Sequence, residues 1–491
     1  MNQRDMFSAP LLTDLYELTM AYGYWKAGVQ DQHGAFNLVF RDAPFNGGFT
    51  VACGLEQVLE LLQGFQFKPD DLAYLATVPG NDGKPIFEDG FLHFLSRMRL
   101  ECDMDAIAEG TLVFPEEPLV CVRGPIIQAQ LIETALLNLI NFPTLVATKA
   151  ARVCIAARGE PVLEFGLRRA QGMDGGLSAS RAAYIGGCSG TSNVLAGRRF
   201  GIPVKGTHAH SWVMLFEDER EAFRAYARAM PNNCILLVDT YNTLAGVRHA
   251  VEVGRELERH GHKLLGVRLD SGDLTYLSKE ARRMLDENGF EATKILASGD
   301  LDENIINSLK QQGAAITLWG VGTRLATAYD QPALSGVYKL TAVRKPGGSW
   351  RPRIKISDQL AKISTPGLQR VRRFRRDGEY VADMIYEETE PVPEAPTIVD
   401  PTDLTRRKHI PSGTAGEELL EPIMRGGEMV YESPPIDRIR QRVQEQLGLF
   451  NDAIKRLINP HQYPVGLEQG LHERKTEMIL REKERLEQGR G

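Results

Sequence analysis

Two histidines one residue apart, in the segment Thr207-His208-Ala209-His210, give this chain its clearest chemical signal. The short apolar run at 201–205 predicts a buried strand that ends just before them, so both imidazoles are expected beside a polar pocket. Imidazole titrates near neutral pH, and it can therefore act as a base, a metal ligand or a nucleophile. An isolated His-x-His is more often structural than functional, so the neighbouring segments must decide its role.

The middle third of the chain repeats a strand–helix unit. From Cys234 onward, short apolar runs recur roughly every 25–30 residues, and apolar residues at helical spacing fill the gaps. Continuous apolar strands that alternate with amphipathic helices indicate a parallel sheet covered on both faces. The pattern leaves a closed barrel and an open doubly wound sheet as alternatives. The predicted strands are 161–165, 201–205, 234–238, 263–268, 293–297 and 315–319.

Polar residues follow each of these predicted strands. The carboxyl ends of parallel strands meet at one edge of the sheet, so these residues would line a single pocket. Turn and helix-cap roles explain Asp239, Ser271 and Asp300 equally well, but they do not explain Arg268 or His210. The residues at the strand ends are Arg168 and Arg169; Thr207, His208 and His210; Asp239; Asp270; Ser298, Gly299 and Asp300; and Gly320, Gly322 and Thr323.

Two of these strand ends indicate phosphate binding. The turn Gly320-Val321-Gly322-Thr323 exposes backbone N–H groups and a hydroxyl with little steric bulk, which can cradle a phosphate. Ser298 and Gly299 on the preceding strand could extend the cradle. Arginines at the rim offer planar donors for phosphate or carboxylate, and Asp239 and Asp270 could hold sugar hydroxyls or Mg²⁺.

The composition narrows the class of protein. A net charge of −6 gives no overall basic surface, so we expect no nucleic-acid partner. The six cysteines form no Cys-x-x-Cys pair and are expected to be reduced thiols, which favours a cytoplasmic protein. The N-terminus leads into no apolar signal segment, and no run of about 18 apolar residues occurs, so we expect neither a leader nor a membrane partner.

The pattern also predicts the domains. Residues 1–130 predict an α+β N-terminal domain. Strands from about 340–390 are expected to complete the sheet of this domain. Residues 131–339 predict a barrel-like α/β catalytic domain that opens with a long apolar helix, which Pro143 should kink or divide. Residues 390–491 predict a helical C-terminal extension, preceded by a Pro- and Glu-rich linker at 387–403.

Taken in order, these motifs resemble the nicotinate phosphoribosyltransferases, a family of type II phosphoribosyltransferases. The resemblance covers residues 8–345, and the joint order and spacing of the motifs are far more specific than any one of them. It implies an irregular α/β barrel with an α+β N-terminal domain and a mixed C-terminal extension. The matching segments are 11–25, 164–172, 190–197, 206–211, 268–273 and 320–323.

The resemblance also implies a reaction. The family joins nicotinate to phosphoribosyl pyrophosphate, giving nicotinate mononucleotide and pyrophosphate for the synthesis of NAD by salvage. ATP hydrolysis is coupled to this step, so the enzyme is classed as a ligase. His210 occupies the place of the histidine that the family phosphorylates, and neutral imidazole is a competent nucleophile toward a γ-phosphoryl group. Mg²⁺ is implied as the cofactor that neutralises pyrophosphate, and a homodimer with shared active sites is implied as the assembly.

Further roles are implied residue by residue. Tyr16 would cover one face of the pyridine ring across the dimer interface, and Phe165 would cover the other. Where a relative that uses nicotinamide has an aspartate, this chain has the neutral Ser192, which favours the acid. The remaining implied contacts are Thr207, Arg268, Arg168 and Arg169 for nicotinate, and Thr323, Gly320, Gly322, Ser298 and Gly299 for the ribose 5-phosphate. Asp270 and Asp239 have less definite implied roles in catalysis and in contacts with the sugar and Mg²⁺–pyrophosphate. Of these two, Asp270 is the implied metal ligand.

Two alternatives from other classes stay open at this point. A metal-dependent hydrolase could use His208 and His210 as a metal pair, but it needs ligands at later strand ends, where no histidine occurs. The later histidines of the repeat, His249, His260 and His262, lie within or just after a predicted helix. The second alternative is a non-catalytic binding protein with the same fold. The only sequence observation against it is that all the motifs of the family are intact.

Overall fold

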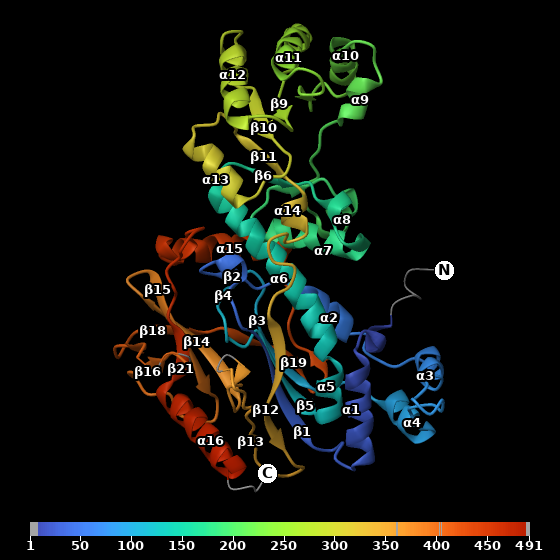
Figure 1. Ribbon diagram of the computed structural model, residues 1–491, viewed down its shortest axis with the longest axis vertical. Coiled ribbons are helices and arrows are strands. Elements are labelled where there is room, and N and C mark those ends of the chain that lie inside the picture. The colour runs from blue at the N-terminus through green and yellow to red at the C-terminus, as the bar shows by residue number, and fades with distance from the viewer. Residues whose placement is uncertain (1–7, 360–361, 402, 404, 488–491) are drawn as a thin grey trace. The chain divides into compact units, whose positions relative to one another are not determined.

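The computed structural model describes residues 8–359, 362–401, 403 and 405–487, and Figure 1 shows its helices and strands. Residues 1–7, which bear on the expected lack of a leader, lie outside this range. The chain forms two compact units. Unit 1 comprises Met1–Thr144, Ala333–Pro435 and Glu445–Gly491, and unit 2 comprises Leu145–Pro332 and Ile436–Gln444.

The long apolar helix differs from its prediction in two ways. Helix α6 (Glu133–Ala156) runs through Pro143, and the break lies instead at Ile132, after α5 (Ile126–Leu131). One lost backbone hydrogen bond does not end a helix whose packing holds it in place. Because α6 also continues past Thr144 into unit 2, the first boundary falls there and not at residue 130.

One helical stretch of the described chain, Ile126–Ala156, is long and apolar enough to cross a membrane by length and composition alone. The sequence prediction allowed for none. Its most apolar window is 61% buried inside the protein, and the core helix of a soluble protein passes the same test, so it is a weak candidate.

Unit 2 is built on a six-stranded parallel sheet in the order β7-β6-β11-β10-β9-β8. Five of the predicted runs contain its strands: β6 (Val162–Glu164), β8 (Ile235–Leu237), β9 (Gly266–Leu269), β10 (Lys294–Ala297) and β11 (Leu318–Val321). The short strand β7 (Gly190–Thr191) carried no recognisable pattern. The run predicted at 201–205 forms only a one-residue parallel bridge, Thr191 to Val204.

The predicted α/β class is confirmed, and the two edges of this sheet show why the barrel is irregular. On one side the Val204 bridge extends the sheet beyond β7. On the other side no further strand of the described chain pairs with β8, but the backbone N–H of Leu237 donates to His208 Nε2 at 3.2 Å. The side chain of His208, in the segment after Val204, thus contacts β8, so a side-chain hydrogen bond links the two edges of the sheet where no backbone pairing does.

Helices follow the strands of unit 2 (Figure 1), and α11, α12 and α13 begin next to side chains that cap them. The caps are residues a few positions beyond each strand end: Asn242 before α11, Asp273 before α12 and Asp302 before α13. The turn-and-cap role is therefore taken by these residues, which leaves Asp239 and Asp270 for other contacts. The helices are α7 (Gly172–Ile185), α8 (Val194–Phe200), α9 (His210–Met214), α10 (Glu219–Ala229), α11 (Thr243–Arg259), α12 (Leu274–Asp286), α13 (Glu303–Gln311) and α14 (Thr323–Ala326), with the short turn η4 (Leu167–Arg169).

Unit 1 contains two larger sheets and a small one. The first is antiparallel, in the order β13 (Arg351–Pro352), β12 (Gly336–Arg344), β1 (His33–Phe40), β5 (Val120–Pro125), β3 (Asp103–Ile107), β19 (Leu420–Arg425) and β20 (Glu428–Met429). The second runs β17 (Arg407–His409), β16 (Thr397–Val399), β21 (Val465–Glu468), β15 (Glu379–Glu387), β14 (Gln369–Arg376) and β18 (Ala415–Glu418). Strands β2 (Thr50–Val51) and β4 (Leu112–Val113) pair with each other.

The helices of unit 1 are short at its N-terminal end and longer near its C-terminal end. They are α1 (Leu15–Lys26), α2 (Leu55–Leu62), α3 (Pro69–Leu75), α4 (Asp89–Arg97), α5 and α16 (Gln469–Glu487), with short turns at Ala9–Leu11, Pro44–Asn46 and Asp452–Lys455; α15 (Ile436–Leu449) has residues in both units.

Two predictions for the C-terminal third need correction. Of the strands expected to complete the first sheet, β12 and β13 do so, but β14 and β15 build the second sheet. The extension after residue 390 contains α15 and α16 as predicted helices, yet strands β16 to β21 lie there too. These strands span only two to six residues, which is too short for a two-residue alternation to be recognised.

Candidate active site

The guanidinium of Arg268 joins three strand ends of unit 2. Strand β9 carries it into a position where its side chain is only 14% exposed. Its Nη1 donates to Thr207 Oγ1 at 3.0 Å, its Nε to Ser298 Oγ at 2.7 Å, and its Nη2 to Asp270 Oδ1 at 2.8 Å. We call Arg268, Thr207, Asp270 and Ser298 the Arg268 network. The sequence predicted all four at one edge, and the structure brings them into direct contact.

Two further groups complete the surroundings of this guanidinium. Its central carbon lies 5.8 Å from the centre of the Phe165 ring, within the range of a cation–π interaction. Ser298 Oγ also donates to Asp270 Oδ1 at 2.5 Å. Burial acts to raise the pKa of Asp270, but the Ser298 hydrogen bond and the Arg268 charge outweigh it and hold that pKa below its usual range. Asp270 is therefore a carboxylate at neutral pH.

Asp239 holds the loop that carries Asp270. Its Oδ2 accepts hydrogen bonds from the backbone N–H of Asp270 at 2.9 Å and from Ser271 Oγ at 2.7 Å. Its Oδ1 is buried and has no hydrogen-bond partner among the residues that the structure describes. A buried carboxylate oxygen without a donor is costly to leave in that state, so it suits a cation or a ligand hydroxyl.

The two histidines differ in every contact. His210 begins helix α9, has a 40% exposed side chain, and places its Nδ1 at 3.1 Å from Thr240 Oγ1. Its Nε2 lies 3.9 Å from Asp270 Oδ2. His208 is buried, with Nε2 accepting from Leu237 N–H and Nδ1 lying 3.3 Å from the Ala209 carbonyl. Both nitrogens of His208 are therefore used by the backbone, and it cannot share a metal with His210.

The glycines of the predicted phosphate-binding turns lie against Phe165 and Asp270. A Cβ on Gly320 would meet the Phe165 ring at 2.8 Å, so only glycine lets β11 pass under that ring. Gly299 has a φ of +111°, and a Cβ there would lie 2.9 Å from the Asp270 carbonyl. Gly322 comes directly before α14, which starts at Thr323, so the turn opens into a short helix. Because these glycines have no side chain, the backbones at the ends of neighbouring strands can approach each other closely.

Ion pairs fix the two loops that the sequence predicts to bind phosphate relative to each other. Arg324, next to Thr323, donates to Asp302 Oδ2 at 2.9 Å, and Asp302 caps α13. The first residue of α13, Glu303, is fully buried and pairs with Lys149 at 2.7 Å and with Arg152 at 2.8 Å. Buried charges are tolerated only when paired, so these contacts hold the loop at 298–302 to helix α6.

Sequence reasoning missed Glu164, the last residue of β6. It is buried and accepts hydrogen bonds from Gly166 N–H, from Ser180 Oγ at 2.9 Å and from Thr191 Oγ1 at 2.5 Å. These bonds fix the turn after Phe165 and the strand before Ser192, whose N–H donates to the Glu164 carbonyl at 2.9 Å. An acid inside an otherwise apolar strand was the available signal.

Other predicted residues lie outside the Arg268 network. Arg168 and Arg169 are exposed on η4, and Ser192 lies at the end of β7. Tyr16 belongs to unit 1, on α1, where its side chain is 46% exposed. Burial and the neighbouring Glu133 raise the pKa of Tyr16 far above its usual range, so its hydroxyl stays protonated.

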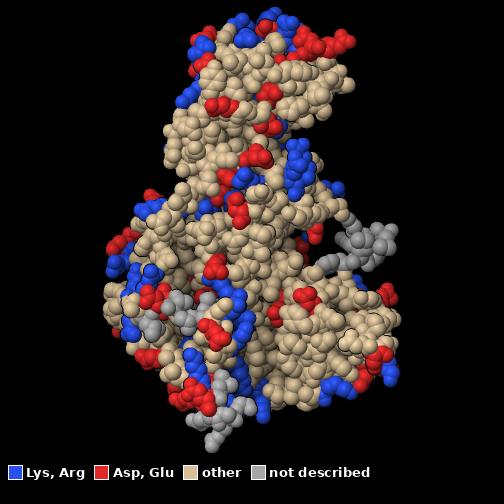
Figure 2. Space-filling view, viewed as in Figure 1, with Lys and Arg blue, Asp and Glu red and all other residues tan. Residues whose placement is uncertain are grey.

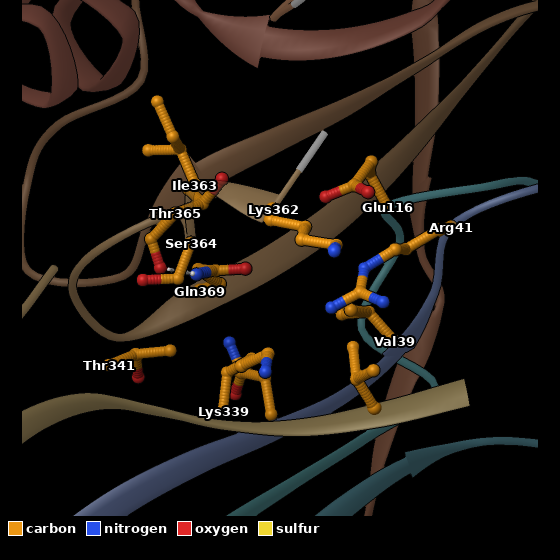
Figure 3. A pocket seen from close by; sticks show the side chains of 12 residues that line it. Val39, Arg41, Glu116, Lys339, Thr341, Lys362, Ile363, Ser364, Thr365 and Gln369 are labelled. Carbon is orange, nitrogen blue, oxygen red and sulfur yellow. Dashed lines mark hydrogen bonds between the residues drawn. The ribbon is translucent and has the colours of Figure 1, made fainter. Parts of the chain in front are cut away.

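Unit 1 contains a separate basic pocket that the sequence did not reveal. Figure 3 shows Arg41, Lys339 and Lys362 turned toward a common space, with Glu116 beside Arg41. Burial raises the pKa of Glu116 to about 7, although the charges of Lys475 and Arg41 oppose this. Figure 2 shows further Lys and Arg side chains over this part of unit 1, near β12 and β13. The chemistry suits an anion, but its residues come from segments too far apart in sequence to form a motif.

Three family models match the chain: the nicotinate phosphoribosyltransferase N-terminal domain at residues 11–141, the nicotinate phosphoribosyltransferase family at 161–374 and the C-terminal domain at 369–475. The nicotinate phosphoribosyltransferase of Bacillus subtilis is 43% identical over 490 residues, which cover 98% of this chain and 97% of that protein. The enzyme of that name from Homo sapiens is 35% identical, covering 94% of this chain and 95% of that protein.

Two solved structures agree with this relationship. The crystal structure of human nicotinic acid phosphoribosyltransferase superposes with a TM-score of 0.82 and 33% identity, covering 95% of this chain and 99% of that one. A nicotinate-nucleotide pyrophosphorylase from Pyrococcus furiosus gives a TM-score of 0.70 at 25% identity, covering 91% and 97%. The fold and the strand-end site thus define a type II phosphoribosyltransferase. Within that class the chain belongs to the nicotinate phosphoribosyltransferase family, which confirms the resemblance of its motifs.

His208 provides a test of the closure between its segment and β8. Burial lowers the pKa of His208 from its ordinary 6.5 to about 4, so the folded protein binds this proton more weakly than the unfolded chain. Stability from the neutral ring is complete above pH 6.5 and is lost as the pH falls toward 4. The loss amounts to about 3 kcal/mol at most.

We expect His208→Gln to flatten the pH dependence of the unfolding free energy, measured by urea denaturation, between these limits. His260→Gln, at an exposed position, is the matched control and should follow the unmodified protein. Equal slopes for His208→Gln and the unmodified protein would show that His208 is not a buried neutral ring.

Proposed function

We propose that this protein transfers the phosphoribosyl group of phosphoribosyl pyrophosphate to nicotinate, releasing nicotinate mononucleotide and pyrophosphate. ATP hydrolysis is coupled to the transfer through a phosphohistidine at His210, which would class the enzyme as a ligase in NAD salvage. Family membership supports the transfer. The single observation that carries the choice of substrate is the orientation of the Arg268 guanidinium by three strand ends.

Arg268 suits the nicotinate carboxylate. A guanidinium presents donors in one plane, and here Thr207, Ser298 and Asp270 fix that plane before any substrate arrives. Phe165 offers an aromatic face beside the same group for the pyridine ring. Ser192 adds no negative charge that would repel an acid, and Arg168 and Arg169 add positive charge at the rim.

The ribose 5-phosphate is assigned to the turn Gly320-Val321-Gly322-Thr323 and to Ser298-Gly299. The glycines place no side chain between a phosphate and the backbone of the turn, and Thr323 supplies a hydroxyl. The Arg324–Asp302 ion pair holds the two loops at a fixed spacing, so the phosphate would meet a preformed cradle.

Mg²⁺ is the proposed cofactor, and the residues present fit it. Asp239 offers a buried carboxylate oxygen that accepts no hydrogen bond from the described residues, and Asp270 is held as a carboxylate beside it. Among the described residues no group of three or more His, Cys, Asp or Glu side chains is placed to hold a metal, which matches a cation that keeps several waters and substrate oxygens as ligands. When bound, Mg²⁺ offsets the charge of the pyrophosphate leaving group.

A homodimer with shared active sites and a cytoplasmic location complete the proposal. Support for the dimer comes from α1, which exposes Leu15, Tyr16 and Met20 at 50%, 46% and 37% of their surfaces. Such a group of exposed apolar side chains suits a partner subunit, and Tyr16 would reach the partner's pyridine ring.

A substrate panel tests the proposed transfer. With phosphoribosyl pyrophosphate, ATP and Mg²⁺, we expect pyrophosphate release with nicotinate and far less with nicotinamide or quinolinate, because Arg268 and Ser192 favour a single carboxylate. Release is measured by a coupled colorimetric assay, and the mononucleotide by mass spectrometry. Failure to release pyrophosphate with all three substrates would show that the protein is a binding protein on an enzyme scaffold.

His210→Ala tests the coupling step. Removing the imidazole should abolish ATP hydrolysis and the acid-labile phosphoenzyme, while slow synthesis without ATP survives because the Arg268 network is intact. Labelling with γ-³²P-ATP reports the phosphoenzyme. His260→Ala, a substitution at an exposed histidine, should label normally. Continued labelling of His210→Ala would place the phosphate elsewhere.

A further inference from the structure

Unit 2 contains two thiols in contact, Cys154 and Cys188, which the proposed reaction does not use. Cys154 lies near the end of α6, and Cys188 lies in the turn between α7 and β7. A hydrogen bond joins their side chains. The backbone next to Cys188 is also close, because a Cβ on Gly187 would lie 3.2 Å from Cys154 Sγ. Both cysteines are free thiols, so the pair is present in its reduced form.

The hydrogen bond gives the two thiols different roles. It raises the pKa of Cys188 well above the usual value, and burial acts in the same direction. A hydrogen bond that favours the protonated thiol is one that this thiol donates, so Cys188 S–H donates to the sulfur of Cys154. Cys188 is fully buried, whereas Cys154 is partly exposed. A small oxidant would therefore meet Cys154 first and find Cys188 behind it.

The turn that carries Cys188 is held in place by hydrogen bonds. Arg440, in the part of α15 that belongs to unit 2, donates to the carbonyl of Gly187 at 2.9 Å and to that of Cys188 at 3.2 Å. The N–H of Cys188 donates to the Ala183 carbonyl at 3.0 Å. Gly187 has a φ of +122°, which favours glycine and leaves space beside Cys154 Sγ. The fold itself thus holds the two sulfurs against each other.

We propose that Cys154 and Cys188 form a peroxide-reactive dithiol site, in which Cys154 is oxidised first and Cys188 then closes a reversible disulfide. In the first step the Cys154 sulfur attacks one oxygen of hydrogen peroxide and becomes a sulfenic acid. The O–O bond breaks, and the other oxygen leaves as hydroxide, which takes up the thiol proton to give water. In the second step the Cys188 sulfur attacks the Cys154 sulfur. The S–O bond breaks as the S–S bond forms, and the oxygen leaves with the Cys188 proton as a second water.

The second thiol protects the first from irreversible damage. A sulfenic acid that meets more peroxide is oxidised to sulfinic and sulfonic acids, which thiols do not reduce, whereas a disulfide is reduced by thiol exchange. An irreversible negative charge at Cys154 would lie on α6, the helix whose Lys149 and Arg152 are paired with the buried Glu303. Closing the disulfide keeps the oxidation of this helix reversible.

The first experiment maps the oxidation in the unmodified protein. The reduced full-length chain is treated with hydrogen peroxide, its remaining thiols are alkylated under denaturing conditions, and its peptides are analysed by mass spectrometry without reduction. We expect linked peptides that contain Cys154 and Cys188, and their disappearance after dithiothreitol. Cys234, a buried thiol directly before β8, should remain alkylated. A sulfenic acid on Cys154 with Cys188 still reduced, or a different pairing, overturns the proposal.

The second experiment separates the roles of the two thiols. In Cys188→Ala, dimedone should trap a sulfenic acid on Cys154, and excess peroxide should leave about tenfold more sulfinic and sulfonic acid there than in the unmodified protein. In Cys154→Ala, Cys188 should stay reduced because it is buried. Cys234→Ala, the same change at another buried position of unit 2, should match the unmodified protein.

Equal over-oxidation of Cys154 in Cys188→Ala and in the unmodified protein overturns the protective role, and oxidation of Cys188 in Cys154→Ala overturns the order of the two steps. Circular dichroism shows whether each variant is folded. The mapping of the unmodified protein decides the proposal even when a variant does not fold. Neither experiment needs a substrate or ATP.

Discussion

The Arg268 guanidinium is the constraint on which the site depends. It is largely buried, and a buried charge needs a counter-charge and hydrogen-bond acceptors to be stable. Asp270, Ser298 and Thr207 supply these from three different strand ends. Hydrogen bonds to charged groups contribute about 1.5–3 kcal/mol each, so the three bonds fix the strand ends to one another before a substrate binds. The cation that would recognise a carboxylate is thus also the group that assembles its own pocket.

Around this network, residues of similar type have separate tasks. Asn242, Asp273 and Asp302 cap the helices, which leaves Asp239 and Asp270 to face the site. The two histidines also have separate roles. His208 uses both nitrogens on backbone groups and joins its segment to β8, whereas His210 keeps an exposed ring at the start of α9. Residues of the same or similar type that lie two or three positions apart therefore make different contacts, because the strand ends place their backbones differently.

The sequence supported the parallel sheet, the shared strand-end edge and the family because long-range order in this unit follows a local repeat. Strand, polar turn and helix recur along the chain, so position in the repeat predicts position in space. It did not predict that the segment after Val204 contacts β8 through the side chain of His208, since a single side-chain bond to a backbone N–H has no periodic pattern. Glu164 was missed because its partners are 16 and 27 residues away. In unit 1, the basic pocket combines segments from residue 37 to residue 369. Only the folded chain shows such sites.

The central claim, that Arg268 recognises the substrate carboxylate, is tested most directly by comparing nicotinate with nicotinamide as substrates of Arg268→Met. The account predicts that kcat/KM for nicotinate falls by about 10- to 150-fold, the equivalent of a charge-assisted hydrogen bond, while kcat/KM for the weak substrate nicotinamide changes far less. A thermal unfolding curve on the same variant records how much of any change is structural. An equal loss for both substrates, or no loss for nicotinate, would contradict the account.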